Sequence, residues 1–484
     1  MEDTRSLRDK TARGFLWGGI NNGTVQLLGA LFGIVMLRLL TPADYGKIAM
    51  LMVFSNLAAT IQESGFTAAL CNCKPTHSDY NAVFWFNIIC SALLYGLLWC
   101  MAPLIARFYG DPDLIALSRY LFLGFFISSW GTVQRAWLFI HLKNKQTCII
   151  AIVSLLVSGL VGMGMAWAGW SYWGLATQNI LFILVVALMN WYYSPWRPTF
   201  HIDLRPAWKM FGFSSRLLLA SIVNQLSSNA FGVLLGKFYG DVQAGIYSNA
   251  RKWDDMCSGT INGMLTGVAQ PVLSQVADNR ERYCQVFRKM LRFVSFVSFP
   301  ALLGMGLISR EFLLIVVGEK WEASARLLTM LSLYGAIFPL LTLYGQLTIS
   351  QGKSRINMWC TSALSALNLG GLVALHPYGI DVMVVYFIAI NVAWLFVWQY
   401  FAGRLVGLRL LHALSDVLPF ALLAAASMAV TWFVTQPITH LFLLLVVRIV
   451  VAASLYLGTL WLLRAAILRE SIHYLMGMKK AHTQ

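Results

Sequence analysis

Charged side chains are scarce in this sequence of 484 residues. Asp, Glu, Lys and Arg make up 12% of the chain, whereas 58% of its residues are hydrophobic. Soluble proteins carry about 25% charged residues, so this composition argues against a water-soluble protein. The hydrophobic residues recur in blocks of roughly 20, which is the length that a helix needs to cross a bilayer. We therefore expect an all-α polytopic membrane protein.

Segments of alternating hydrophobicity are also lacking. A transmembrane barrel would contain segments of about 10 residues in which apolar and polar side chains alternate. Residues 149–170 and 441–463 are instead apolar on all sides. This pattern excludes a barrel and favours a bundle of helices.

Acidic residues are outnumbered by basic ones. The chain has 20 Asp and Glu against 36 Lys and Arg, which gives a formal charge of +16. In a soluble chain this excess would suggest nucleic acid as a partner. Here the basic residues concentrate in alternate connections between the apolar blocks, with 25 on one side and 10 on the other. Cytoplasmic connections are enriched in Lys and Arg, so we expect both termini in the cytoplasm and no nucleic-acid partner.

Motifs for catalysis and for cofactor binding are absent. The eight cysteines lack the paired spacing of a disulfide framework and are typical of small core residues. Cys71, Cys73 and His77 offer three metal ligands without a fourth nearby, so we expect no metal site. Phosphate-binding loops, nucleophile elbows and metal-binding helices are missing too. The sequence predicts a protein without a cofactor and without enzymatic activity.

The apolar blocks predict about fourteen transmembrane helices. The first follows a basic tail and has no signal-peptide cleavage site, so we expect it to be a membrane span. None of the connections is long enough to fold as a separate domain. The predicted spans are 14–40, 44–70, 80–104, 115–140, 147–170, 172–193, 210–236, 243–275, 290–308, 323–350, 356–376, 381–402, 414–434 and 440–467.

The chain also repeats itself after 199 residues. This offset places Gln26 on Gln225, Phe32 on Phe231, Gly33 on Gly232 and Gly46 on Gly245. Six spans separate the two copies, so both copies enter the membrane from the same side and form a parallel repeat. We expect an N-terminal six-helix lobe at 1–200, a C-terminal six-helix lobe at 201–405, and two extra helices of little polarity with a cytoplasmic tail at 406–484.

Polar side chains inside the spans are the candidate functional residues, because each is costly in hydrocarbon unless it is paired or hydrated. Small-residue series, including Gly259, Gly263 and Gly267, indicate either close helix packing or helices that flex during transport. In the eighth span, Arg251 either neutralises the acidic residues near it on the same helix or binds an anionic headgroup. Arg216 either contributes to binding or reaches the cytoplasmic surface. The candidates for substrate binding are Arg251, Lys252, Arg135, Arg216, Gln225, Asn229 and Gln26, and those for ion coupling are Glu63, Asp254 and Asp255.

Several short strings, in this order and spacing, resemble a family of bacterial polysaccharide exporters. They are residues 40–46 (LTPADYG), 63–66 (ESGF), 134–136 (QRA), 193–198 (YSPWRP), 318–321 (GEKW) and 351–355 (QGKSR). The sequence resembles the Wzx-type lipid-linked oligosaccharide flippases, in particular the WzxC-like branch of the polysaccharide transport family. The resemblance covers about residues 10–410.

The resemblance implies the fold of the multidrug/oligosaccharidyl-lipid/polysaccharide (MOP) superfamily. It also implies a bacterial inner-membrane transporter for an oligosaccharide on undecaprenyl pyrophosphate, with Arg251 as the best candidate for a pyrophosphate contact. Membrane lipids and polysaccharide polymerase machinery are the further partners implied. Three alternatives remain open: a multidrug or cation antiporter that uses a carboxylate such as Glu63 or Asp255, a membrane-bound polysaccharide polymerase or ligase, and a structural scaffold.

Overall fold

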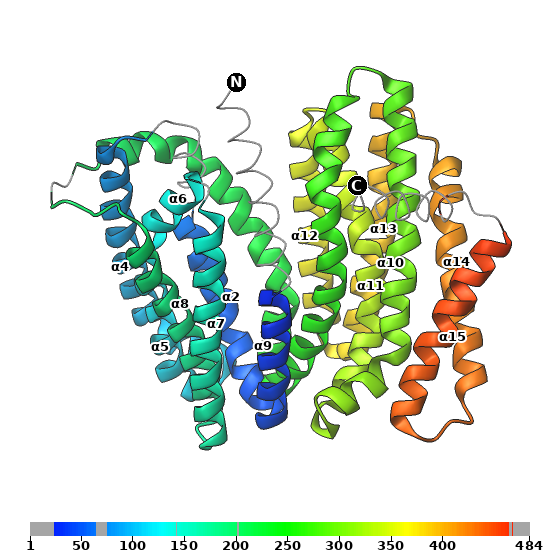
Figure 1. Cartoon of the computed structure of the whole chain (residues 1–484), viewed down its shortest axis with the longest axis horizontal. Helices are drawn as coiled ribbons and strands as arrows, with labels where there is room; N and C mark the ends of the chain where they lie inside the picture. Colours follow the sequence, from blue (N-terminus) through cyan, green and yellow to red (C-terminus); the bar gives the residue numbers. More distant parts are fainter. Residues whose placement is uncertain (1–23, 64–74, 142, 201–202, 464–466, 468–484) are drawn as a thin grey trace, which may run out of the picture. The chain divides into compact units, whose positions relative to one another are not determined.

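The protein is a bundle of long helices (Figure 1). The structure is a computed structural model, and it describes residues 24–63, 75–141, 143–200, 203–463 and 467. Within these ranges nine helices are long and apolar enough to cross a membrane, and a bent pair of shorter helices makes a tenth span. The expected polytopic α-helical architecture is confirmed.

Contacts between Cα atoms divide the chain into two compact units, residues 1–245 and 246–484. The expected lobe boundaries at 200 and 405 remain predictions. The first unit contains a helix at Thr24–Leu39 and then α2 (Pro42–Glu63), α4 (His77–Tyr109), α5 (Asp113–Ser129), α6 (Thr132–Ile140), α7 (Asn144–Trp167), α8 (Tyr172–Tyr193) and the first part of α9 (Arg205–Gln275).

The fourth predicted span, 115–140, is broken and not continuous. Helices α5 and α6 meet at an angle of 45°. At the break, a Cβ on Gly131 would lie 2.9 Å from the Cα of Ala187, so α8 packs too closely for a larger residue. The carbonyl of Trp130, which the break frees, accepts a hydrogen bond from Trp191 Nε1 at 2.5 Å. Close packing of α8 and this bond account for the bend.

Helix α9 contains two predicted spans, separated at Gly240. Gly240 has φ 84° and ψ −178°, a conformation that is nearly restricted to glycine. The chain then packs tightly against the start of α2. A Cβ on Gly46 would lie 1.8 Å from the carbonyl oxygen of Asp241, and a Cβ on Gly245 would lie 1.8 Å from the carbonyl oxygen of Pro42.

These two contacts are equivalent under the repeat found in the sequence. The offset of 199 residues that relates Gly46 to Gly245 also relates Pro42 to Asp241. Each repeat therefore places its glycine against the same backbone position of the other repeat. This reciprocal contact is what a two-fold relation between parallel repeats requires, and it explains why both positions are glycine.

The second unit contains the second part of α9, six further helices and two short 3-10 turns. They are α10 (Arg280–Val316), η1 (Glu319–Trp321), α11 (Glu322–Ser350), α12 (Ser354–Leu375), η2 (His376–Tyr378), α13 (Ile380–Val406), α14 (Leu410–Thr435) and α15 (Leu441–Leu462). Helix α10 is much longer than its predicted span, 290–308. Its polar first turns continue the helix from a cap at Asn279, whose side chain accepts from the Arg282 N–H at 3.0 Å.

Helices α14 and α15 are fastened to α10 by charged groups. Arg288 donates to the Asp416 carboxylate through Nε at 2.6 Å and Nη2 at 3.1 Å, and Arg292 Nε lies 2.8 Å from the same carboxylate. Near the other end of α10, Arg448 forms an ion pair with Glu311 at 2.8 Å. As expected, the two extra helices have little polarity. Their charged residues Asp416 and Arg448 nevertheless hold them to α10.

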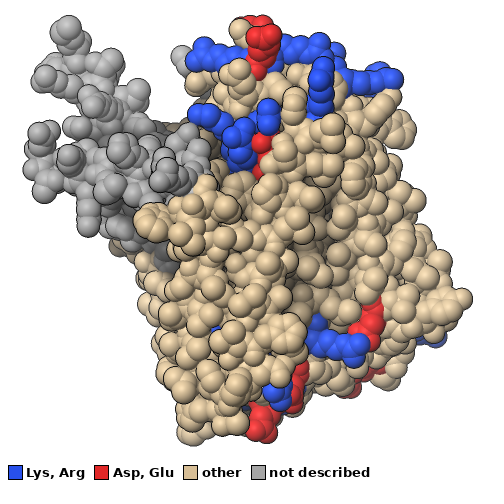
Figure 2. Space-filling view, turned by 90° about the vertical axis from the view of Figure 1, so that its right-hand side faces the viewer, with Lys and Arg blue, Asp and Glu red and all other residues tan. Residues whose placement is uncertain are grey.

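Charged residues gather at opposite ends of the exposed face drawn in Figure 2. One end is mostly blue with Lys and Arg, the middle is almost uncharged, and the other end mixes both signs. In the second unit the start of α10 and the connections that follow α11 and α13 are rich in Lys and Arg. An uncharged middle between charged ends is typical of a protein that crosses a bilayer.

Candidate functional site

A cluster of charged and aromatic side chains lies in the second unit, where α9 packs against α11. Arg251 Nε lies 2.9 Å from Asp255 Oδ1 and donates to Oδ2 at 3.0 Å. The guanidinium carbon lies 5.3 Å from the centre of the Tyr334 ring, close enough for a cation–π contact. The side chain of Arg251 is 22% exposed and that of Asp255 is 52% exposed. The pair therefore lies at a surface that a ligand can reach.

Asp254 lies beside this pair but is fully buried. Within the part of the chain that the structure describes, neither of its carboxylate oxygens has a hydrogen-bond partner. Gly335 of α11 makes room for it, since a Cβ on Gly335 would lie 2.2 Å from Asp254 Oδ1. A buried carboxylate without a hydrogen-bond partner is costly in a membrane-spanning segment, which makes Asp254 a candidate for binding a proton or a cation.

The cluster lies at mid-depth in the unit. Its two partners on α11, Tyr334 and Gly335, are near the middle of this 29-residue helix. Helix α11 is also the most enclosed of the candidate spans, with 67% of its apolar window buried. Substrate and coupling-ion sites of membrane transporters lie near the bilayer midplane, and the cluster occupies that depth.

The face of α9 that carries Arg251 continues as an open surface. Gly259, Gly263 and Gly267 follow Asp255 at intervals of four residues, and a Cβ on any of them would have no neighbour within 4 Å. The prediction that these glycines pack closely against another helix is wrong in this structure. Small side chains here leave a smooth, accessible strip that begins at the charged pair.

The remaining candidates are not brought together into one site. Lys252 lies 5.9 Å from the ring centre of Trp253 on α9. In the first unit, Arg135 is exposed on α6, and Gln26 is exposed on the helix Thr24–Leu39. Asn229 donates to the backbone carbonyl of Gln225 at 2.8 Å, and both side chains are half-buried. These residues remain candidates for substrate binding only because of their positions in the predicted spans.

Three sets of predicted residues cannot be placed. Glu63 ends α2 and Arg216 lies within α9, but their side chains are outside the described residues. Cys71 and Cys73, two of the three ligands considered for a metal, also lie outside the described residues.

The sequence reasoning missed several residues of interest. Tyr334 and Gly335 belong to the cluster, but they lie far from Arg251 in the sequence and only the fold brings them together. Gln134 of α6, which the sequence does place among the polar residues of the fourth predicted span, is fully buried with no hydrogen-bond partner among the described residues. Arg448 had a usable signal, since it is a lone charge within the apolar stretch 441–463.

Comparison with known proteins relates the sequence to polysaccharide assembly. The chain is 26% identical over 368 residues to the teichuronic acid biosynthesis protein TuaB of Bacillus subtilis (strain 168), covering 75% of this chain and 76% of that protein. It is 26% identical over 359 residues to the lipopolysaccharide biosynthesis protein WzxC of Escherichia coli (strain K12), covering 73% and 72%.

Comparison with solved structures shows the fold. The lipid II flippase MurJ, in an inward closed conformation, matches with a TM-score of 0.73 and 14% identity over 94% of this chain and all of that one. An inward-facing multidrug resistance MATE family transporter of the MOP superfamily matches with a TM-score of 0.60 and 14% identity over 83% and 95%. The chain thus shares its fold with a lipid II flippase and with a multidrug transporter, two proteins that move different substrates.

A family model described as "polysaccharide biosynthesis protein" matches residues 35–326, which is more than half of the chain. The match includes α2 and the whole of α9, which carries Arg251, Asp254 and Asp255. The chain therefore belongs to this polysaccharide biosynthesis protein family.

Proposed function

We propose that this protein is a flippase that moves an undecaprenyl-pyrophosphate-linked oligosaccharide across the bacterial inner membrane by alternating access. The glycan is the repeat unit of an O-antigen, a capsule or an exopolysaccharide. Both termini lie in the cytoplasm, and the substrate moves from the cytoplasmic to the periplasmic leaflet. The observation that carries the proposal is the accessible Arg251–Asp255 pair at mid-depth, in a chain of this family.

The chemistry of this pair suits the substrate. A pyrophosphate cannot cross hydrocarbon unaided, so the protein must offer a hydrated, cationic path. The guanidinium of Arg251 presents planar N–H donors that fit phosphate oxygens. Substrate phosphate replaces the Asp255 carboxylate as its partner, and the freed carboxylate accepts hydrogen bonds from sugar hydroxyls. The open strip of Gly259, Gly263 and Gly267 gives a bulky glycan room to pass.

The other candidates act along the same path. Lys252, Arg135 and Arg216 supply further positive charge, and Gln26, Gln225 and Asn229 supply amides for sugar hydroxyls. Polymerase machinery that receives the flipped repeat unit is the expected downstream partner. The connections on the side opposite the termini are short, so the protein transports the glycan and does not extend it.

Asp254 is the leading candidate for energy coupling. Its burial without a partner means that it must take up a proton or a cation whenever the cluster is closed to water. Water that reaches the cluster from one side would release that ion on that side. Glu63 and Asp255 are the other carboxylates available for such a cycle.

Deletion of the gene in its native host tests the proposal. We expect loss of one surface polymer and accumulation of the undecaprenyl-linked repeat unit in the cytoplasmic leaflet, both restored by the wild-type gene. Unchanged glycans and carrier lipids, together with increased sensitivity to cationic drugs, would assign the protein to multidrug transport instead. Repeat units that reach the periplasmic leaflet but are not polymerised would indicate a polymerase.

A further inference from the structure

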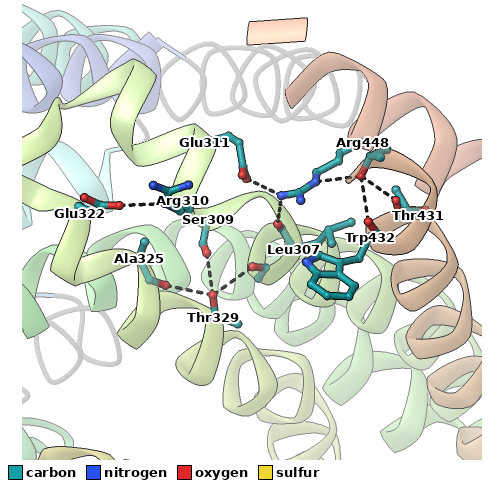
Figure 3. A network of polar contacts seen from close by, with 12 residues as sticks. Leu307, Ser309, Arg310, Glu311, Glu322, Ala325, Thr329, Thr431, Trp432 and Arg448 are labelled. Atoms are coloured by element: carbon teal, nitrogen blue, oxygen red, sulfur yellow. Dashed lines mark hydrogen bonds and ion pairs between the residues drawn. The ribbon is translucent and has the colours of Figure 1, made fainter. Parts of the chain in front are cut away.

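A buried ion pair joins α10 to α15 in the second unit. It lies near the C-terminal end of α10 and the N-terminal end of α15. Arg448 Nη1 lies 2.8 Å from Glu311 Oε2, and the two side chains are only 9% and 4% exposed. Arg448 also donates through Nε to Thr435 Oγ1 and through Nη1 to the Leu307 carbonyl, both at 3.2 Å. Figure 3 shows the guanidinium pointing between α10 and α14. The cluster around Arg251, which lies at mid-depth, does not include this pair.

The ion pair lines a cavity of about 630 Å³ between α10, α11, α14 and α15. One wall is polar, with Ser309, Arg310 and Thr329 beside the pair. Ser309 and Thr329 share a hydrogen bond of 2.7 Å, and Arg310 lies 2.8 Å from Glu322. These contacts hold the polar wall in place (Figure 3).

The rest of the cavity lining is apolar and leads to the outside of the helix bundle. Met428 is buried in this wall, whereas Leu333, Trp432 and Phe433 are 46%, 44% and 69% exposed. Their exposed surfaces form a path for hydrocarbon from the polar wall outward. The cavity therefore combines a charged interior with an apolar exit.

Both members of the ion pair keep unused hydrogen-bonding capacity. Within the described residues, Arg448 Nη2 has no hydrogen-bond partner, and Glu311 has no partner at Oε1. The site can thus donate to an anion and accept from a cation at neighbouring points. An anion alone would meet the Glu311 carboxylate, and a cation alone would meet the Arg448 guanidinium. A ligand that carries both charges satisfies both groups.

The ion pair lies just below the depth of the headgroup region. Glu311 is about 8 Å from the end of α10 and Arg448 about 10 Å from the start of α15, at 1.5 Å per residue. Polar headgroup regions occupy roughly the outer 5–8 Å on each side of a 30 Å hydrocarbon core. The charges around the cavity also balance, because Arg310 and Arg448 face Glu322 and Glu311.

We propose that this cavity is a binding site for one zwitterionic aminophospholipid. Its phosphate bonds to the free edge of Arg448, its ammonium group bonds to Glu311, and its acyl chains leave along Trp432 and Phe433. The occupant is a membrane lipid, because the site opens through an apolar wall just below the headgroup region. Occupancy would brace α14 and α15 against α10. The proposal does not depend on the transported substrate.

Lipid binding to the purified, delipidated full-length protein tests the proposal. Native mass spectrometry would compare one added lipid at a time, palmitoyl-oleoyl phosphatidylethanolamine or palmitoyl-oleoyl phosphatidylglycerol. We expect the tightest site to prefer the ethanolamine lipid by about tenfold, the effect of about one charge-assisted contact. Glu311→Gln should reverse this preference, since the guanidinium then stands without its carboxylate. Asp381→Asn, which breaks an exposed pair with Arg326 at the same end, is the matched control and should leave the preference unchanged.

A second pair of variants leaves the charges intact. Ala429 lines the cavity and is exposed, whereas Ala426 is exposed on the same helix and does not line it. Ala429→Trp should abolish the tightest lipid site, and Ala426→Trp should preserve it. Equal binding of the two lipids, an unchanged preference in Glu311→Gln, or normal binding in Ala429→Trp would each overturn the proposal.

Discussion

At the residue scale, Arg251 and Asp255 form a pair that is stable without substrate and open to exchange. Their contact is short, yet both side chains retain exposed surface, so the pair gains only modest stability from its Coulomb attraction. The same guanidinium also rests on Tyr334, which fixes its position when the carboxylate leaves. A positioned cation with an exchangeable partner is what transient binding of a phosphate requires.

Replacement of Arg251 should impair substrate binding without impairing folding. Arg251→Gln should lower transport at least tenfold, since the loss of one charge-assisted contact has about that effect. Arg251→Lys should retain part of the activity, because a lysine keeps the charge but not the planar fork. Restoration of the surface polymer in the deletion strain measures both. Arg326→Gln, in an exposed pair about 12 Å along α11 from Tyr334, is the control. Normal transport by both Arg251→Gln and Arg251→Glu would remove Arg251 from the site.

Gly335 should tolerate substitution as poorly as a polar residue of the site does. Gly335→Ala would place a Cβ 2.2 Å from Asp254 Oδ1, so the carboxylate must move. Overpacking of this kind costs about 1–3 kcal/mol. We expect a lower unfolding temperature in detergent and reduced transport. Gly304→Ala is the control, because its Cβ would meet only Met428 Cε at 3.6 Å. The double variant with Asp254→Ala should recover stability but not transport, whereas recovery of both would exclude a role for Asp254.

At the element scale, local sequence determines the helices and the fold determines their breaks. Hydropathy predicted α7 and α11–α15 to within a few residues, since each is a long apolar segment between polar connections. The bend between α5 and α6 depends on the close approach of Ala187, which lies far away in the sequence. The long N-terminal extension of α10 was missed because its polar first turns carry no membrane signal. Half of the candidate site was predicted. Its α9 residues were identified by their charge, whereas their partners on α11 were not identified.

The reciprocal contact of α2 with α9 gives a prediction for both repeats. Gly46→Ala and Gly245→Ala should each force the backbones apart, because the new Cβ would lie 1.8 Å from a carbonyl oxygen. We expect both variants to fold poorly and to a similar degree, which expression level and thermal unfolding in detergent would measure. Gly164→Ala, in α7 with nothing within 4 Å, should be neutral or slightly stabilising. Unequal effects of the two repeat positions would argue against their equivalence.

At the scale of the whole molecule, each end of each unit brings together connections that are predicted to lie on the same side of the membrane. In the first unit, Lys47 lies 3.2 Å from Asp111 and 2.5 Å from Asp113, which joins two connections predicted on the outside. At the opposite end, Asn81 accepts from the Thr199 N–H at 2.9 Å, between two connections predicted inside. In the second unit, Arg326 and Asp381 pair at 2.9 Å across two outside connections. Alternation of the spans is therefore consistent within each unit.

Single cysteines in the connections would establish the orientation of the chain. In a background whose native thiols have been blocked or replaced, Asp111→Cys and Glu319→Cys should react with a membrane-impermeant maleimide in intact spheroplasts. Lys145→Cys and Lys353→Cys should react only after lysis, because the positive-inside distribution places these basic connections in the cytoplasm. All four positions have exposed or half-buried side chains, so access to the reagent depends on the membrane and not on packing. The opposite labelling pattern would place both termini outside and reverse the direction of transport, whereas a mixed pattern within one unit would contradict the alternation of its spans.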